Sequence, residues 1–414
     1  MLPSDLRDRV TAAFVDRFGR RPQVVVRAPG RVNLLGAHVD YSEGWVITGA
    51  IDRAVWLAAA PATGRATRIE ALDLGESADF ELERLAPPVP ERPDASTWVD
   101  VPAGVAWALA ETGHRPRPMD VALASDVPIG AGVSSSAAVE MAFLMAWENL
   151  AGEGGFGLSG GERARIGMRA ENGYLGVQSG IMDQFSSLHG AADRLVFLDC
   201  RSLDYEHLPL PDSVRILIAD SGVRRRLVDF DYSDRRRQCQ EAVAILEPHL
   251  PGIRTLRDVS SEDFERTSHH LPMTLRRRAR HAVDECQRTR EGAAALGRGD
   301  LTTFGRLMRQ SQLSSRDLYE VSIPELDVLA AAAWGVEGCY GARLAGAGFG
   351  GCLTVLAEAS AVETLRQAMV TEFEQDFGRR PEIVTGAIGD GARVVPPLIA
   401  PASIGSAGSE AQSA

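Results

Sequence analysis

The 414-residue chain contains no lysine, so all 44 of its basic side chains are arginines. The absence of lysine excludes a Walker-A phosphate loop, the strand lysine of a protein kinase, and a Schiff base to pyridoxal phosphate or to a carbonyl substrate. If the protein handles phosphates, it must hold them with backbone amides, arginine and a metal ion.

Other features that the sequence lacks exclude further classes of protein. Five cysteines, an odd number without C-x-x-C spacing, argue against a disulfide framework or a zinc site. The first residues lack the apolar stretch of a signal peptide, and no uncharged run reaches the roughly 20 residues of a membrane span. The net charge of −12 argues against a nucleic-acid or anionic-membrane partner. We therefore expect a cytoplasmic protein that binds neither nucleic acid nor membrane.

Two packed domains are expected from the length and from the pattern of apolar residues. A polar stretch with two prolines near residues 203–212 predicts a boundary, which gives domains over 1–205 and 206–395 and a disordered tail over 396–414. In the first half, we expect a strand from Val24 that runs into a loop rich in glycine and proline. Helical spacing predicts the longer helices of the chain at 6–18, 98–110, 134–150, 162–174, 235–246, 275–290, 301–314, 323–333 and 362–377.

A first motif, RAPGRVNLLGAHVDY at residues 27–41, concentrates Arg31, Asn33, His38, Asp40 and Tyr41 in one short stretch. Such a density of different donors and acceptors is typical of a binding site. A solvent-exposed loop can also carry these residues without a function, so the residues alone leave both interpretations open.

A second motif, PIGAGVSSSAA at residues 128–138, stands between a predicted strand and a long predicted helix. Glycines let the backbone approach a phosphate closely, and the first N–H groups of a helix attract anions. The alternative is an ordinary serine-capped helix, which accounts for one serine but not for three serines and two glycines. The motif therefore favours a phosphate-binding loop.

A third motif holds two acidic residues, Glu171 near the end of a predicted helix and Asp183 within the run GIMDQF. An acid among apolar neighbours is costly to bury unless it has a partner or a chemical role. Taken alone, Asp183 is better explained as a helix-capping residue.

A fourth motif, GARLAGAGFGG at residues 341–351, contains the spacing G-x-G-x-x-G. A dinucleotide-binding loop must open a helix, whereas the residues that follow, CLTVL, predict a strand. We therefore reject the dinucleotide-binding interpretation. A glycine-rich loop between strands is either a tight hairpin or a surface on which a ligand or another loop packs closely.

The four motifs in this order resemble the GHMP small-molecule kinases and, within them, the galactokinases. The resemblance extends from about residue 24 to residue 395 and includes the stretches at 199–203, 232–239 and 319–327. It implies an α+β fold of two domains, with an N-terminal domain similar to ribosomal S5 domain 2 and a ferredoxin-like C-terminal domain. It also implies an ATP-dependent, Mg²⁺-dependent sugar-1-kinase, a monomer or weak homodimer, with its active site between the domains.

The resemblance assigns roles to positions that match the family motifs. Asp183 corresponds to the acid beside the anomeric hydroxyl, and Arg31 to the arginine that pairs with it. The sugar-contacting positions of the family correspond to His38, Asp40, Gly180 and Tyr232. Ala37 corresponds to one further sugar-contacting position. The phosphate loop corresponds to Pro128, Gly130, Gly132, Ser134, Ser135 and Ser136, the positions near Mg²⁺ to Ser136 and Glu171, and an aromatic near the adenine to Trp98.

The sequence departs from the family pattern at several positions. Ala37 stands where galactokinases have a glutamate that binds outer hydroxyls of galactose, and plant galacturonokinases resemble this chain in having Ala-His there. Galactose and a C6-modified sugar such as galacturonate therefore both remain open, with Arg224 or Arg225 as a candidate partner for a carboxylate. Gln312 replaces a common histidine. A sugar sensor that binds ATP and sugar without transferring phosphate is the alternative from another class.

Overall fold

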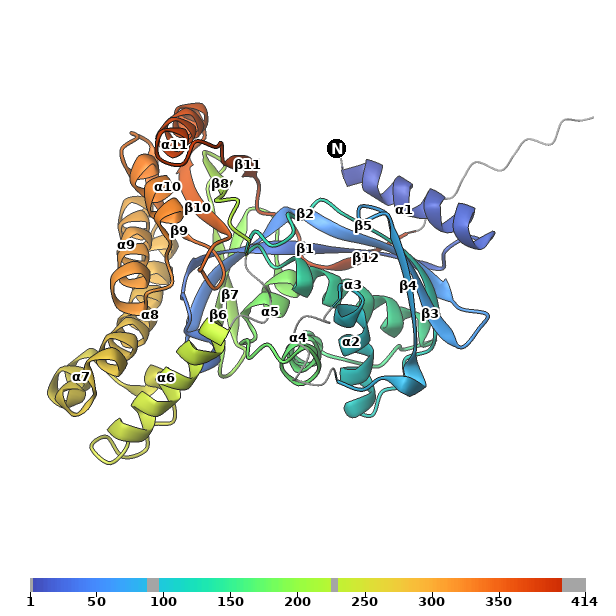
Figure 1. Ribbon diagram of the computed structural model, residues 1–414, viewed down its shortest axis with the longest axis horizontal. Helices are drawn as coiled ribbons and strands as arrows, with labels where there is room; N and C mark the ends of the chain where they lie inside the picture. Colours follow the sequence, from blue (N-terminus) through green and yellow to red (C-terminus); the bar gives the residue numbers. More distant parts are fainter. Residues whose placement is uncertain (1–2, 88–96, 225–229, 397–414) are drawn as a thin grey trace, which may run out of the picture.

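The computed structural model describes residues 3–87, 97–224 and 230–396. Figure 1 shows two parts, a large sheet with helices on its faces and a smaller sheet covered by helices of the second half of the chain. The expected two-domain α+β architecture is confirmed. The tail predicted from residue 396 lies outside the described residues except for its first member, and so does Arg225. Among the described residues, no helix combines the length and apolar character needed to cross a bilayer.

Within the described residues, the larger sheet has eight strands, antiparallel except for the pair β3 and β5. The main path runs β12-β1-β2-β5-β3-β4, and β6 joins β7 to β2. The strands are β1 (Val24–Leu35), β2 (Trp45–Pro61), β3 (Ala66–Ala71), β4 (Glu76–Glu81), β5 (Met119–Ser125), β6 (Arg194–Asp199), β7 (Tyr205–Pro209) and β12 (Arg393–Val395).

Helices cover both faces of this sheet (Figure 1). Helix α1 (Pro3–Phe18) buries Leu6, Val10 and Phe14, whose spacing of four residues puts them on one face against the sheet. The opposite face carries α2 (Asp100–Glu111), α3 (Ser135–Leu150), α4 (Gly160–Arg169) and α5 (Met182–His189).

The smaller sheet, as far as the chain is described, has four antiparallel strands in the order β11-β8-β10-β9, the strand order of a ferredoxin-like domain. Its strands are β8 (Val214–Asp220), β9 (Cys339–Leu344), β10 (Cys352–Glu358) and β11 (Glu382–Gly386). The helices of this part are α6 (Phe230–Leu246), α7 (Ser261–Thr267), α8 (Met273–Gly297), α9 (Leu301–Ser314), α10 (Pro324–Trp334) and α11 (Val362–Phe377).

Strand β1 differs from its prediction, because the expected loop after Val26 is part of the strand. The strand continues to Leu35 with all twelve residues buried, and it absorbs the Pro-Gly pair by a shift of register between Pro29 and Arg31. The helix predicted over 162–174 is likewise two elements. Helix α4 begins at a capping box made by Ser159 and Glu162, and a π-helical turn, η4 (Ala170–Leu175), follows it.

The chain crosses between the two sheets more than once. Strand β7 straddles the boundary predicted after residue 205 and pairs with β6 in the larger sheet. Strand β12, from the far end of the described chain, lies beside β1 (Figure 1). One hydrophobic core also spans both parts, with Val39 and Ile181 of the first packed into the same cluster as Leu329 and Val355 of the second. The two parts are therefore held together by burial of shared apolar surface.

Candidate active site

A cavity of about 400 Å³ lies where the two parts meet, and residues of both parts line it. Most of the predicted site residues line this cavity: Arg31, His38, Asp40, Trp98, Gly130, Gly132, Ser134, Ser135, Ser136, Glu171, Gly180, Asp183 and Tyr232. Two predicted residues, Ala37 and Pro128, are not among its lining. Ala37 directly precedes His38 in the same loop and is completely buried, 0% exposed.

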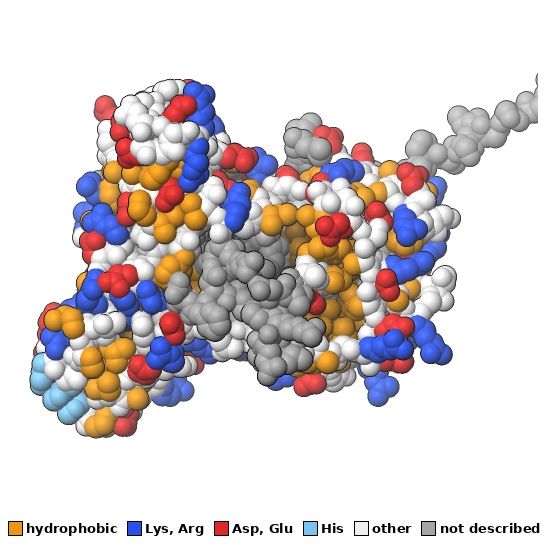
Figure 2. Space-filling model, viewed as in Figure 1, with side chains coloured by type: hydrophobic (Ala, Val, Ile, Leu, Met, Phe, Trp, Pro, Cys, Tyr) orange, Lys and Arg blue, Asp and Glu red, His pale blue; other side chains and the backbone are white. Residues whose placement is uncertain are grey.

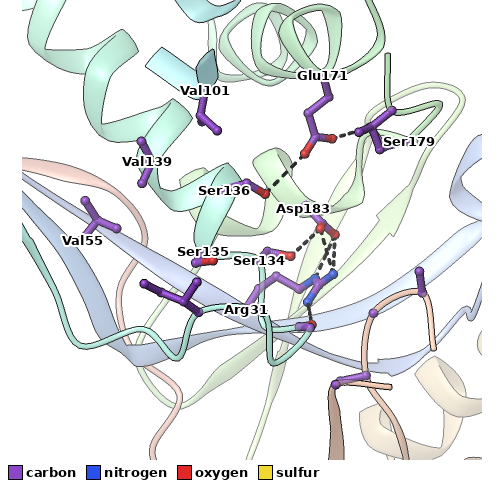
Figure 3. Close-up of a pocket in the computed structure, with 18 of the residues that line it drawn as sticks. Arg31, Val55, Val101, Ser134, Ser135, Ser136, Val139, Glu171, Ser179 and Asp183 are labelled. Carbon is purple, nitrogen blue, oxygen red and sulfur yellow. Dashed lines mark hydrogen bonds and ion pairs between the residues drawn. The ribbon is translucent and has the colours of Figure 1, made fainter. Parts of the chain in front are cut away.

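Arg31 and Asp183 form a two-pronged ion pair in the cavity (Figure 3). The Arg31 Nε and Nη2 atoms donate to the two carboxylate oxygens at 2.9 and 2.8 Å. Ser134 donates its hydroxyl hydrogen to the same carboxylate. The Arg31 side chain is 3% exposed and that of Asp183 is 26% exposed, so the carboxylate still faces the cavity. A planar guanidinium held in this way fixes the carboxylate in one orientation.

Two hydrogen bonds of Arg31 attach the predicted phosphate loop to β1, at the register shift of this strand. The backbone N–H of Arg31 donates to the Val133 carbonyl at 2.9 Å, and Arg31 Nη1 donates to the Gly132 carbonyl at 2.6 Å. Gly30 permits this approach, because a Cβ there would lie 2.7 Å from the Val133 oxygen. The same arginine therefore positions both the loop and Asp183.

Ser134 precedes helix α3, but its side chain makes no capping hydrogen bond. Its backbone is left-handed, with φ of 58°, and its hydroxyl is directed to Asp183 instead. The first N–H groups of α3 thus have no side-chain cap from the residue before them. This is the arrangement in which a helix N-terminus binds phosphate, and it differs from the capped-helix alternative.

The glycine-rich loop at residues 345–351 packs against the phosphate loop, backbone to backbone. A Cβ on Gly346 would lie 2.9 Å from the Gly132 oxygen, and one on Gly132 would lie 3.0 Å from the Ala345 oxygen. Strand β10, and not a helix, follows this loop, so the rejection of a dinucleotide-binding loop is confirmed. The loop is a contact surface that joins the second part of the chain to the phosphate loop.

Ser136 and Glu171 face each other across the start of α3 (Figure 3). The Ser136 Oγ lies 3.5 Å from Glu171 Oε1, and Ser179 donates to the other carboxylate oxygen. Burial and the nearby charge of Asp183 raise the pKa of Glu171 to about 7. Among the described residues, no cluster of three or more His, Cys, Asp or Glu side chains could hold a metal ion. One carboxylate and one hydroxyl oxygen suit Mg²⁺, which completes its shell with water and substrate phosphates.

The end of the cavity away from α2 carries His38 and Asp40. His38 Nε2 donates to the Ala347 carbonyl at 2.9 Å, and its Nδ1 lies 3.0 Å from the Tyr41 hydroxyl. Asp40 is 9% exposed, and burial together with the charge of Asp183 raises its pKa to about 6. Gly180 packs directly on the Asp40 carboxylate, where a Cβ would collide with it.

The opposite end of the cavity is apolar, and Figure 2 shows hydrophobic side chains gathered in a hollow there, over α2 and α3. Val55, Val101, Leu123 and Val139 line it, with Trp98 at the same end. An apolar slot of this kind suits a flat, uncharged ring such as a nucleotide base.

Sequence reasoning missed this apolar lining and also Ser179. Valine and leucine within a strand or helix resemble ordinary core residues, because no local pattern tells which face opens onto a cavity. Ser179 carried one weak signal, its position directly before Gly180, but a serine beside a glycine is common in any loop.

Comparisons with known proteins identify the class to which the chain belongs. The model of the GHMP kinases N terminal domain matches residues 100–191, and that of the GHMP kinases C terminal domain matches residues 293–375. The chain is therefore a small-molecule kinase of the GHMP class, whose sugar kinases use ATP and Mg²⁺. A mevalonate kinase structure shares this fold at 18% identity, with a TM-score of 0.57 over 89% of this chain and 100% of that one.

Within that class, the galactokinase galactose-binding signature matches residues 12–61. The chain is 44% identical to a galactokinase of Roseiflexus sp. (strain RS-1) over 94% of this chain and 96% of that protein. It is 38% identical to the galactokinase of Homo sapiens over 95% of this chain and 97% of that protein. The structure of Lactococcus lactis galactokinase complexed with galactose matches at 30% identity, with a TM-score of 0.86 over 92% of this chain and 98% of that one. The chain belongs to the galactokinase family and is a sugar kinase of that type.

Proposed function

We propose that this protein transfers the γ-phosphoryl group of ATP to the anomeric hydroxyl of galactose. The observation that carries the proposal is the two-pronged pair of Arg31 and Asp183, which lies between the phosphate loop and the end of the cavity with His38 and Asp40. A carboxylate there can accept the proton of a sugar hydroxyl. A guanidinium beside it can offset the charge that develops on the transferring phosphoryl group.

The remaining residues bind and orient the two substrates. Backbone amides of the loop at 130–136 and the start of α3 would bind the phosphates, and the apolar slot beside Trp98 would hold the adenine. His38, Asp40 and Tyr232 would contact the sugar. Ser136 and Glu171 would hold Mg²⁺, which when bound neutralises phosphate charge. The catalysis assigned to this chain is therefore mostly positioning and electrostatic stabilisation.

The charge of the cavity supports a neutral sugar over a uronic acid. Among the described lining residues, Arg31 is the one arginine, and Asp183 already occupies it. Arg224 does not reach the sugar end, because its side chain lies beside Gly130 of the phosphate loop and pairs with Asp220 at 2.7 Å. The carboxylate of galacturonate would thus enter a site that already holds several acids. Galacturonate is retained as the second candidate because Ala37 replaces the glutamate of the family.

A panel of sugars tests the proposal. Purified protein with ATP and Mg²⁺ is given galactose, galacturonate, glucose or no sugar, ADP release is followed by a coupled assay, and the product is examined by ³¹P NMR. We expect galactose to give the highest kcat/KM and a phosphate on the anomeric carbon. Faster turnover of galacturonate would reverse the choice of sugar. Sugar and ATP binding without any ADP release would instead support the sensor.

A further inference from the structure

We propose that Glu285 and His281, two buried residues of helix α8, are positioning residues that hold the loop carrying the sugar-binding side chains. The proposal deepens the function proposed above and rests on it for the identity of the sugar. Neither residue lines the cavity, and both come from the part of the chain opposite to the loop that they hold.

Helix α8 holds the peptide groups on either side of Ala37. Glu285 Oε1 accepts hydrogen bonds from the backbone N–H groups of Gly36 and Ala37 at 2.9 and 3.0 Å. One helical turn earlier, His281 Nε2 lies 3.1 Å from the Ala37 carbonyl oxygen. A carbonyl can only accept, so His281 donates from Nε2, and its Nδ1 lies 2.8 Å from the Ser314 hydroxyl. Both backbone polar groups of Ala37 are therefore bound by side chains of α8.

The surroundings of Glu285 also keep its carboxylate ionised, as a strong acceptor for the two backbone N–H groups. The residue is fully buried, and burial alone would raise its pKa, but the charge of Arg288 leads the opposing interactions that hold that pKa at about 2. The ion pair with Arg288 uses Oε2, which leaves Oε1 for the loop and for the Ser311 hydroxyl at 2.7 Å. A purely structural ion pair would not need an ionised oxygen aimed at two backbone amides.

The held peptide leads directly into the sugar end of the cavity. Gly36 and His38 both have left-handed backbones, with φ of 93° and 55°, and this conformation is unfavourable for histidine. His38 and Asp40 line the cavity immediately beyond. Without its bonds to α8, the loop can relax toward ordinary backbone angles, which moves both side chains. The phosphate loop is bound to β1 instead and should keep its place.

Steady-state kinetics and amide exchange of three variants test the proposal. Glu285→Ala removes the acceptor, and His281→Phe keeps a ring but removes the donor to Ala37. Ser311→Ala is the matched control, because it removes another buried partner of the same carboxylate oxygen without touching the loop. We expect Glu285→Ala to raise KM for the sugar about tenfold or more while KM for ATP changes by less than about twofold. His281→Phe should act in the same direction, and Ser311→Ala should leave both constants unchanged.

Hydrogen–deuterium exchange of the peptide that contains residues 36–38 gives a readout that needs no turnover. Its amides should exchange faster in Glu285→Ala than in the wild type and remain slow in Ser311→Ala. Equal changes in both KM values, unchanged exchange, or the same effects in Ser311→Ala would overturn the proposal. Should Glu285→Ala not fold, Glu285→Gln, which keeps an acceptor oxygen, should show a smaller effect than His281→Phe. If the wild type does not phosphorylate galactose, the proposed function fails, while the exchange result still decides the role of α8.

Discussion

Ser134 gives its hydroxyl hydrogen to Asp183 and does not cap helix α3, which it precedes. The two residues are 49 positions apart, and their contact joins the phosphate loop to the acid that we assign to proton transfer. The left-handed backbone of Ser134 turns its side chain away from the helix and toward the cavity. One serine therefore leaves the helix N-terminus, where we propose that phosphate binds, without a side-chain cap and at the same time restrains the orientation of Asp183.

Asp183→Asn tests the proton acceptor. The amide keeps the size of the side chain but cannot take the sugar proton, so we expect kcat to fall by about 10²–10⁴-fold. Nucleotide affinity, measured by calorimetry, should change little because Asp183 does not contact the apolar slot. Asp212→Asn, on an exposed loop, is the control. A variant at 183 that keeps its full rate would show that another group takes the proton.

Glu171→Gln tests the proposed Mg²⁺ site. Loss of the charged oxygen should raise the Mg²⁺ concentration for half-maximal rate by about tenfold or more, and Ser179→Ala, which only orients that carboxylate, should do so less. A magnesium titration at fixed ATP measures both, with the exposed Glu153→Gln as control. An unchanged magnesium requirement in Glu171→Gln would remove this residue from the site.

The raised pKa of Asp40 predicts that KM for the sugar depends on pH. Its pKa is raised to about 6, so below that pH the carboxyl is neutral and loses acceptor capacity for sugar hydroxyls. At saturating ATP and Mg²⁺, KM for the sugar should rise as the pH falls through about 6. Asp40→Asn should have a high KM that does not respond to pH in this range. A wild-type KM that is flat from pH 5 to 8 would contradict this assignment.

The raised pKa of Asp40 also makes the stability of the sugar-free protein depend on pH. Stability falls as the pH rises, whereas sugar binding improves. Folding favours the protonated form of Asp40, so this contribution to stability is present below the ordinary pKa of 3.8 and is lost as the pH rises through about 6. Thermal unfolding of wild type and Asp40→Asn measures it. The variant should gain stability relative to the wild type as the pH is raised from 5 to 7, and an unchanged difference would argue against the raised pKa.

Two glycines allow the contact between the glycine-rich loop and the phosphate loop to be tested. Gly346 and Gly378 both have left-handed backbones, with φ of 70° and 64°, but only Gly346 faces another backbone. Alanine at either position should destabilise the fold by about 1–2 kcal/mol through its backbone angles. Gly346→Ala must also displace Gly132, so its KM for ATP should rise several-fold. Equal KM values for ATP in the two variants would show that the contact does not position the phosphate loop.

Several features of the site could be predicted because they depend on residue types at short spacing. Glycines and serines before a helix, and acids and an arginine beside them, indicate phosphate chemistry wherever they occur. The strand that follows residues 346–351 could be read in the same way. The full extent of β1 could not, because Pro29 and Gly30 indicate a loop locally, and the pairing with β2 on either side of them overrides that signal.

The sequence by itself determined the kinase class, the pair of Arg31 and Asp183 as candidates, and the absence of any lysine that could replace them. Only the tertiary structure decided that these two residues meet across 152 positions, that the loop at 345–351 rests on the phosphate loop, and that α8 holds the peptide of Ala37. The physical reason is that hydrophobic burial, which brings distant segments together, is not directional. Periodicity shows which face of a segment is buried, whereas its partner is set by the packing of the whole chain.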